Sequence, residues 1–533
     1  MSIGKNQKKI ECDVTIVGLG PTGATLAGLL GSFGLAVTVI DKLDELYPHP
    51  RAAGIDHEAL RILQRLGLGE AMKTHVEPYR TSEYHGQSGS VIKRISPASP
   101  PYPLGWFPNN VFDQPYMERL LRARLREHEN VEVLLNTEVL GVTDTREGTT
   151  VSAVDTVDGQ SISIASRYTV ACDGGSSHIR RNLGIELEDH GFHEPWLVVD
   201  AEVSKEAAAR LPSTQVQYCE PERPTTFVVL VGRLRRWEIR LDEGELPTGV
   251  ALSDEQIWPY LKRWITPEDA TIRRSAAYTF HGLTAVEWKR SHIILAGDAV
   301  HMTPPFMAQG MVQGMRDADN LAWKLSKVIK QDASQQLLES YEEERRPHVL
   351  ETTTRAIELG TIIGERNSEA ATLRDDQLHI ESVGGTLTTV RQDLIPTLKS
   401  GFLEGSSPGA GSLLPQPFVH DSEGQVLLDD VVGQGFTVVA TVLPSAEVSV
   451  AVEALDAQII VIGTERNPLE TIADRVIAVS ETEGVMTRWL DLNDATFALV
   501  RPDKYVFGTA FTSHGLVQLT EAARAKLGVR NLG

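Results

Sequence analysis

The ten residues VTIVGLGPTG, Val14–Gly23, place a short β-branched run directly before a glycine-rich turn. Residues 24–33, mostly small residues and leucines, are expected to form a helix, and residues 36–40 a second strand that ends at Asp41. A strand, a glycine turn, a helix and a second strand make up the unit that binds dinucleotides. The stretch therefore predicts an α/β domain with a nucleotide site at its first turn.

Each glycine of this turn has a physical task in such a unit. Gly18 allows the tight turn, Gly20 lets the backbone approach a pyrophosphate, and Gly23 lets helix and strand pack closely. The helix N-terminus offers unpaired N–H groups to phosphates, and Asp41 is placed to accept hydrogen bonds from the adenosine ribose. A purely structural turn is the alternative interpretation, and the spacing alone does not separate FAD from NAD.

Two further turns lie downstream, each an apolar run that ends in an acid beside a glycine. The first is YTVACDGG, residues 168–175, and the second is IILAGDAVH, residues 293–301. Taken singly, an aspartate beside a glycine is an ordinary turn. Nucleotide-like turns separated by most of a domain favour one long cofactor held at both ends, and FAD has that shape.

Composition limits the class of protein. A chain of 533 residues is expected to form two or three domains. The net charge of −21 argues against a nucleic-acid or anionic-membrane surface, and no continuous apolar stretch is long enough to span a bilayer. The three cysteines have no paired spacing, which excludes a disulfide framework or a cysteine-rich zinc site and fits a reducing compartment. We therefore expect a cytoplasmic protein without a metal centre.

The order of the three turns resembles that of the group A flavoprotein aromatic monooxygenases, the single-component FAD hydroxylases, over nearly the whole chain. The branch that it resembles most is 3-(3-hydroxyphenyl)propionate hydroxylase. The residues that carry this likeness are RAAGIDHEAL at 51–60, RRWE at 235–238, YTFH at 278–281, and PPF with QGM at 304–306 and 309–311.

The resemblance implies a Rossmann-like FAD-binding domain of the glutathione-reductase type, with an inserted mixed β-sheet substrate domain and a thioredoxin-like C-terminal domain. The expected FAD-binding segments are 1–80, 100–190 and 285–365, and the expected substrate-domain segments are 81–99 and 191–284. Residues 366–404 would connect them to the C-terminal domain at 405–533. Because no cysteine follows Cys219, that last domain cannot perform dithiol chemistry, and a packing or homodimer contact is the better hypothesis for it.

The resemblance also implies which residues bind the cofactor. Asp41, next to Lys42, would bind the adenosine ribose, and Asp173 would support both FAD and the nicotinamide donor, NADH or NADPH. Ser176 and Ser177 replace a more usual arginine–serine pair, which puts a phosphate or NADPH contact there in doubt. The full predicted set is Gly18, Gly20 and Gly23 at the pyrophosphate, Asp41 and Lys42, Arg51 and Gln114 at the pyrophosphate and ribityl region, Asp173, Gly297 and Asp298 at the ribityl chain, and Gly310 and Met311 at the flavin ring.

The chemistry implied by the family is hydroxylation of a phenol. NAD(P)H would reduce FAD, O2 would add to give a flavin C4a-hydroperoxide, and its distal oxygen would attack an electron-rich ring. The protein must exclude water, orient the ring and help to remove the phenolic proton. Candidates for the proton role are Asp56, His57, Tyr218 and His281, and Pro305 would border the ring. Arg235, Arg236 and Arg240, with Trp237 among them, could bind a hydroxyphenylpropionate-like acid, although strand alternation lets only some of them face a pocket.

The sequence is also compatible with other functions. An epoxidase or a halogenase could share the fold, although the chain lacks the Trp-x-Trp-x-Ile-Pro motif that halogenases usually show. A hydroxylase of a larger polycyclic or heteroaromatic phenol is a further alternative. A non-enzymatic FAD-binding protein is the remaining one, but it would leave the two downstream turns without a purpose.

Overall fold

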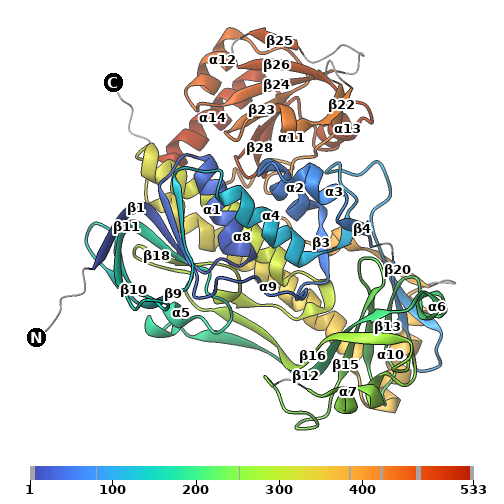
Figure 1. Ribbon diagram of the computed structural model, residues 1–533. Helices are drawn as coiled ribbons and strands as arrows, with labels where there is room; N and C mark the ends of the chain where they lie inside the picture. Colours follow the sequence, from blue (N-terminus) through green and yellow to red (C-terminus); the bar gives the residue numbers. More distant parts are fainter. Residues whose placement is uncertain are drawn as a thin grey trace, which may run out of the picture.

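The computed structural model describes residues 7–79, 81–250, 252–382, 386–420, 424–463, 470–473 and 475–528. Figure 1 shows two sheet-containing regions joined by long helices, with the C-terminal region packed on one side. Among the described residues, every helix is too short or too polar to cross a membrane.

The first sheet is built around β1 (Lys8–Val17), which is flanked by parallel partners on both sides. Its core residues Val14 and Ile16 are fully buried, as expected for a parallel strand covered on both faces. On one face, α1 (Pro21–Ser32) packs against α4 (Gln114–Leu125) and α8 (Gly310–Lys330). The sheet order is β17 (Lys289–Arg290), β18 (Ile293–Leu295), β11 (Ser161–Ala171), β1, β2 (Val37–Ile40) and β8 (Val131–Leu134), with β9 (Thr137–Asp144) and β10 (Thr149–Asp155) attached through β11.

This topology brings the separated turns of the sequence together. The strands β1, β2, β11 and β18 run parallel to one another. Parallel strands end at the same edge of a sheet, where doubly wound folds bind nucleotides. Gly18, Asp41, Asp173 and Gly297 follow the ends of these four strands, so the predicted juxtaposition of the turns is present.

The second sheet collects strands from distant parts of the chain. Its β5 (Ser82–His85) and β6 (Val91–Ser96) come from the N-terminal part, whereas β20 (Leu387–Val390) comes from the segment predicted as a connection. One face packs on an apolar core with α7 (Asp254–Leu261), and this core includes Trp237. The sheet order is β19 (His301–Met302), β16 (Ala270–Ala285), β12 (Leu187–Val203), β15 (Leu234–Arg240), β14 (Thr225–Val229), β13 (Gln215–Tyr218), β5, β6 and β20.

Small elements and long helices connect the two sheets. A short sheet has the strand order β3 (Gly54–Asp56), β7 (Asn109–Phe112) and β4 (Val76–Pro78), and α2 (His57–Arg65) begins directly after β3. The helix α9 (Gln336–Gly364) is the longest in the described part of the chain and packs on both α8 and β16. The remaining elements here are α3 (Gly69–Lys73), α5 (His178–Asn182), α6 (Lys205–Arg210), α10 (Ser368–Glu381) and the single 3₁₀ turns Gly297–Ala299, Pro305–Met307 and Arg391–Leu394.

The C-terminal region is a mixed α/β domain, drawn in orange and red in Figure 1. Its central strands are parallel and its outer strands antiparallel. The sheet order is β25 (Glu470–Ala473), β26 (Val476–Ser480), β24 (Gln458–Gly463), β23 (Thr437–Ala440), β27 (Phe497–Val500) and β28 (Val506–Ala510). Also present are β21 (Phe418–His420), β22 (Gln425–Leu427), α11 (Leu428–Val431), α12 (Ala446–Glu453), α13 (Val485–Leu492) and α14 (Ser513–Leu527).

Buried ion pairs fasten this domain to the rest of the molecule. The guanidinium of Arg61 on α2 contacts both carboxylate oxygens of Asp429 at 2.7 and 2.9 Å. On α9, Glu344 lies 2.9 Å from the ammonium of Lys324 and 2.8 Å from the guanidinium of Arg501, which follows β27. All of these side chains are nearly or fully buried. A buried charge is tolerated only when it is paired, so the domain position is set by electrostatics as well as by apolar packing.

We expect Glu344→Gln to destabilise the protein by about 3–5 kcal/mol, because it leaves Lys324 and Arg501 short of a buried partner. Burial alone would raise the pKa of Glu344, but Arg501 and Lys324 outweigh it and lower the pKa from 4.5 to about 2. The stabilisation by this carboxylate is therefore present above pH 4.5 and is lost as the pH falls towards 2. Denaturant unfolding at pH 7 measures the loss, and Glu343→Gln, at the exposed neighbouring position, should change stability by less than about 0.5 kcal/mol.

Candidate functional site

The first glycine turn combines two sterically required glycines with one that faces open space. Gly18 has φ = +102°, and a Cβ there would overlap the carbonyl of Cys172. A Cβ on Gly23 would overlap the carbonyl of Gly18. In contrast, a Cβ on Gly20 would meet no atom within 4 Å. The turn is thus held tightly on one side and left open on the side where a pyrophosphate is predicted.

The acids at the strand ends are held by backbone donors. Asp41 accepts from the N–H of Leu19 at 2.7 Å, which ties the end of β2 to the glycine turn. One oxygen of Asp173 accepts from the N–H groups of His178 and Ile179, at 2.8 and 3.2 Å. The other oxygen, Oδ1, is buried and has no hydrogen-bond partner among the described residues. A buried acceptor without a donor is costly, so this oxygen suits a ligand hydroxyl or amide.

The Gly297–Asp298 turn is held in place by Asp317 on α8. The N–H of Gly297, at φ = +63°, donates to Asp317 at 3.0 Å, and Asp317 also contacts His301 at 2.7 Å and Arg345 at 2.9 Å. The Asp298 residue is exposed to solvent. The protein around it still desolvates the carboxyl enough to raise its pKa, while the charges of His301 and Arg51 oppose that shift.

Gln114 and Arg236 fix the loop that carries Arg51. The amide oxygen of Gln114 accepts from the N–H groups of Arg51 and Ala52 at 2.8 and 2.6 Å. The guanidinium of Arg236 donates to the carbonyls of Pro50 and Arg51 at 2.7 and 2.8 Å. The Arg51 side chain remains exposed. Gln114, which the sequence predicts as a cofactor contact, is thus engaged by the protein backbone, and the exposed Arg51 guanidinium is the group left for a phosphate.

These features together fit FAD. The open side of Gly20, the unpartnered Asp173 oxygen and the accessible Asp298 carboxyl lie at neighbouring strand ends of one sheet edge. Gly310, at the start of α8, likewise would carry a Cβ into open space. Lys42 is exposed beside Asp41. The site therefore offers an extended cradle with donors and acceptors for a pyrophosphate, a ribose and a ribityl chain.

The segment before α8 is backbone-strained. Ala308 has φ = +50°, a left-handed conformation that costs a non-glycine residue about 1–2 kcal/mol. A Cβ on Gly54 would come within 3.2 Å of the Cβ of Ala308, so the segments at 50–56 and 305–311 pass side by side. Strain of this kind is typical of functional sites whose surroundings hold the backbone in place.

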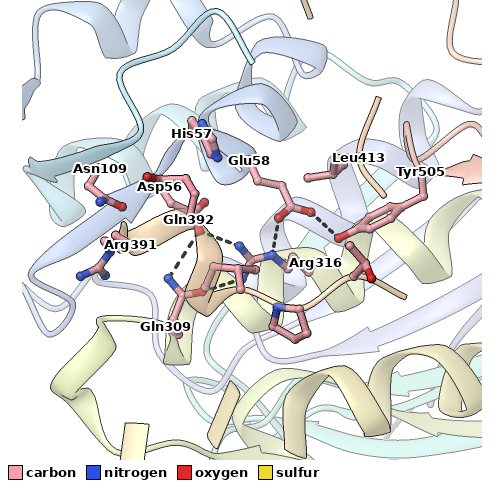
Figure 2. A pocket seen from close by; sticks show the side chains of 13 residues that line it. Asp56, His57, Glu58, Asn109, Gln309, Arg316, Arg391, Gln392, Leu413 and Tyr505 are labelled. Carbon is pink, nitrogen blue, oxygen red and sulfur yellow. Dashed lines mark hydrogen bonds and ion pairs between the residues drawn. The ribbon is translucent and has the colours of Figure 1, made fainter. Parts of the chain in front are cut away.

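A polar cavity of about 160 Å³ is lined in part by Gln309 of this segment, and Figure 2 shows the side chains around it. The buried guanidinium of Arg316 lies at its centre and contacts Asp56 at 2.6 Å, Glu58 at 2.5 Å and the side-chain oxygen of Gln309 at 2.6 Å. The complete lining is Asp56, His57, Glu58, Asn109, Gln309, Arg316, Arg391, Gln392, Ile395, Pro396, Thr397, Leu413 and Tyr505.

The predicted proton-transfer residues Asp56 and His57 line this cavity. Burial would raise the pKa of Asp56, but the Arg316 guanidinium outweighs it and holds the pKa below its usual range. Asp56 also caps α2 by accepting from the N–H of Ala59 at 3.0 Å. Burial lowers the pKa of His57, and its Nδ1 has no partner among the residues that the structure describes. Asp56 is thus a paired carboxylate, which is a poor base, whereas His57 is neutral.

The structure does not bring the other two proton-transfer candidates to this cavity. Tyr218 packs on the apolar core of the second sheet, 5.7 Å from the ring of Trp264. His281 is half-buried at the opposite end of that sheet, where its Nδ1 lies 2.8 Å from Nδ1 of His193.

Each predicted substrate arginine already has protein partners. Arg236 pairs with Asp200 at 2.6 Å, and Arg240 pairs with Glu194 at 2.9 Å. Arg235 donates to the carbonyls of Gly232 and Leu234. Trp237, between them, is fully buried in the apolar core.

Sequence reasoning missed Glu238, the next residue along β15. Glu238 is 6% exposed and lies 3.8 Å from Arg236, and no hydrogen bond is formed by its carboxylate within the described chain. Burial raises its pKa, and Arg236 opposes the shift. Side chains alternate along a strand, so the burial of Trp237 in the apolar core directs Glu238 to the opposite face. That alternation in RRWE was the available signal.

Comparison with known proteins decides the family. A family model described as an FAD binding domain matches residues 11–356, and one described as the HcaD C-terminal domain matches residues 411–526. The chain is 36% identical, over 93% of its length and 92% of the relative's, to a probable NADH-specific resorcinol 4-hydroxylase of Rhodococcus jostii (strain RHA1). This protein belongs to the FAD-dependent aromatic hydroxylases. The predicted family and the FAD cofactor are confirmed.

Other relatives and solved structures agree. The 3-(3-hydroxy-phenyl)propionate/3-hydroxycinnamic acid hydroxylase of Comamonas testosteroni is 30% identical, with 94% of both chains covered, and that of Mycolicibacterium gilvum (strain PYR-GCK) is 31% identical, covering 94% of this chain and 89% of the relative. The flavin-dependent monooxygenase PieE has a TM-score of 0.80 at 18% identity, covering 98% of this hydroxylase and all of PieE. Aklavinone-11 hydroxylase has a TM-score of 0.76 at 20% identity, covering 97% of this chain and 99% of that one. The predicted fold class is confirmed.

The steric difference between two glycines gives a test of the cradle. Gly20→Ala adds a methyl group that meets no protein atom, so the FAD-free protein should keep its Tm while its FAD dissociation constant rises at least about tenfold. Gly23→Ala meets the Gly18 carbonyl and should lower both Tm and FAD binding. Flavin fluorescence titration and thermal unfolding measure the two effects. Unchanged FAD affinity in Gly20→Ala would remove the pyrophosphate from this turn.

Proposed function

We propose that this hydroxylase acts on a small uncharged dihydroxybenzene of the resorcinol type, with NADH as the electron donor. The observation that carries the proposal is a buried carboxylate, Glu238, that lacks a hydrogen-bond donor in the described chain beside arginines that are already neutralised. The likeness to the resorcinol 4-hydroxylase of Rhodococcus jostii supports the same substrate class and the same donor.

The position of Glu238 supports a role at the substrate. Arg236, its neighbour, contacts the loop at Pro50 and Arg51. Burial raises the pKa of Tyr79, and the charge of Glu238 adds to that shift. The Arg391 guanidinium lies 5.4 Å from the centre of the Tyr79 ring and donates to the carbonyl of Met307. Glu238 is thus connected through Arg236 to the loop that carries Arg51, and through Tyr79 and Arg391 to the segment 305–311, which is predicted to border the flavin ring.

The charge balance favours a neutral substrate. Asp200 and Glu238 face Arg236 and Arg274, which gives two negative and two positive groups. A substrate carboxylate placed here would add an uncompensated negative charge beside a buried carboxylate, which is strongly unfavourable. A phenolic hydroxyl, in contrast, supplies the donor that Glu238 lacks.

An aromatic wall next to Pro305 suits a benzene ring. Trp196 stacks on Phe280 with ring centroids 5.8 Å apart, and Phe306 meets the edge of Trp196 at 5.4 Å. Trp196 is fully buried, so this wall excludes water from one side of the site.

When bound, FAD supplies electron transfer from the nicotinamide donor and activation of O2. The chain's own contribution is to orient the ring and to handle the phenolic proton. A hydrogen bond from a ring hydroxyl to the Glu238 carboxylate would fix the orientation of the ring and increase electron density at the ortho and para carbons. Of the two candidates that line the cavity with Gln309, neutral His57 is better suited than Asp56 to accept the proton, because Asp56 is paired with Arg316.

A hydroxyphenylpropionate-like acid is the second candidate. It is favoured by the relatives named for 3-(3-hydroxy-phenyl)propionate at 30–31% identity. To bind this acid, Arg236 or Arg240 would have to exchange its protein carboxylate for that of the substrate, whereas Arg235 contacts only backbone carbonyls in the described chain.

A substrate comparison tests the proposal. We expect resorcinol to stimulate NADH oxidation and O2 uptake with a kcat/KM at least about tenfold above that of 3-(3-hydroxyphenyl)propionate, the factor that corresponds to about 1.4 kcal/mol of transition-state binding. Mass analysis should find one added oxygen atom in the product, and NADH should be used in preference to NADPH. Preference for the propionate would reverse the assignment in favour of the second candidate.

Glu238→Gln should lower kcat/KM for resorcinol by about 10–100-fold, because an amide accepts a hydroxyl hydrogen bond more weakly than a carboxylate. In the unaltered enzyme kcat/KM should also fall at acidic pH as Glu238 becomes protonated, and the variant should lack this decrease. Glu202→Gln is the matched control: Glu202 lies on the neighbouring strand β12 and pairs at the surface with Arg233 and Arg273, so its loss should not affect kcat/KM.

Glu238→Gln should also be more stable than the unaltered protein at neutral pH. Because burial raises the folded-state pKa of Glu238 above its usual 4.5, the stabilising contribution of this group is present below pH 4.5 and is lost as the pH rises through the raised pKa. Replacing the carboxylate with an amide should therefore raise the Tm of the FAD-free protein at pH 7. Full activity together with an unchanged Tm would show that Glu238 is neither buried as a charge nor in contact with substrate.

A further inference from the structure

A residue of the C-terminal domain reaches the cavity behind the α8 N-terminus. Tyr505 lies just before β28, and its hydroxyl donates to Oε1 of Glu58 at 2.7 Å. Tyr505 is 6% exposed, and its ring forms part of the cavity wall in Figure 2. Burial raises its pKa well above the usual value, so it remains a neutral hydrogen-bond donor.

The contact continues through charged groups to the start of α8. The other oxygen of Glu58 accepts from Nε of Arg316 at 2.5 Å, and Nη1 of Arg316 donates to Oε1 of Gln309 at 2.6 Å. Tyr505, Glu58, Arg316 and Gln309 thus form an unbroken chain of hydrogen bonds, which we call the Tyr505–Gln309 chain (Figure 2). Every member is at least nine-tenths buried.

The end of this chain holds a strained segment. Gln309 directly follows Ala308, whose φ of +50° is unfavourable for a residue with a side chain. It directly precedes Gly310, where an added Cβ would enter open space. Such a conformation persists only when several contacts fix it, and the Gln309 side chain has two, Arg316 and, at 3.4 Å, Asp56.

We propose that Tyr505 is a positioning residue for the flavin: through the Tyr505–Gln309 chain the C-terminal domain sets the backbone of Gly310–Met311 against the ring. The proposal rests on the predicted contact of Gly310–Met311 with FAD. It gives the C-terminal domain a role at the active site that needs no redox group of its own.

The electrostatics of the Tyr505–Gln309 chain explain why loss of the Tyr505 hydroxyl should affect Gln309 at the other end. Without the Tyr505 donor, one oxygen of a buried carboxylate loses its partner, and Glu58 is free to rotate both oxygens towards Arg316. The guanidinium would then shift away from Gln309, which leaves Ala308 and Gly310 less constrained. The expected consequence is a misplaced flavin edge in a protein that still folds.

Tyr505→Phe in the full-length protein is the test, because the phenyl ring and its packing stay. We expect the FAD dissociation constant to rise about threefold to tenfold, the size of one typical net hydrogen bond, because Tyr505 acts on the flavin only through the other members of the chain. We also expect the visible spectrum and the reduction potential of the bound flavin to shift. Tyr260→Phe is the matched control. It removes a similar phenol–carboxylate hydrogen bond, Tyr260 to Glu245 at 2.8 Å, at α7 on the outer face of the second sheet.

Two outcomes would overturn the proposal. One is a Tyr505→Phe protein that loses thermal stability but binds FAD with unchanged affinity, spectrum and potential. The other concerns the double variant Tyr505→Phe with Glu58→Gln. If Tyr505 acts through Glu58, the double variant should bind FAD no more weakly than Glu58→Gln alone. Effects of the two substitutions that multiply would show that Tyr505 acts independently of Glu58, which contradicts the proposal. These measurements need no aromatic substrate, so a different preferred phenol would refute the proposed function while leaving this inference standing.

Discussion

The buried guanidinium of Arg316 is the constraint around which the site is organised. A cation with 3% exposure can remain there only if anions and acceptors surround it, and Asp56, Glu58 and Gln309 supply them. Its partners come from the end of β3, the first turn of α2 and the residue that caps α8. Neutralising one charge therefore fixes both the segment that carries the predicted proton-transfer residues and the segment predicted to border the flavin.

The parts of the fold that the sequence predicted correctly depend on local signals. A β-branched run before Gly18, or an apolar run before Asp173, indicates a strand and a turn without reference to distant residues. Parallel topology then brings the turns together by a general rule, so the family and the cofactor could be inferred. The residue-level roles assigned to the FAD contacts remain predictions.

The parts that could not be predicted depend on pairing across the chain. Arg236 looked available in the sequence, but Asp200, 36 residues away, and the carbonyls of Pro50 and Arg51 occupy it. Gln114 is similarly bound to backbone donors more than sixty residues distant. A sequence shows which side chains carry charge, whereas only the folded arrangement shows which of them still lack a partner. Glu238 was overlooked for the same reason, although strand alternation already separated it from Trp237.

The buried pair of Arg61 and Asp429 has a consequence for synthesis of the chain. These residues are 368 positions apart, so at about 5–20 residues per second the ribosome takes roughly 20–70 s to deliver the aspartate after the arginine. During that interval Arg61 lacks both the Asp429 carboxylate and the Leu414 carbonyl that it contacts in the folded protein, so its cation must stay hydrated at the surface of α2. The face of α2 that carries Arg61 is thus sealed only after the last domain has emerged from the ribosome, so this surface stays open to water for most of the synthesis of the chain.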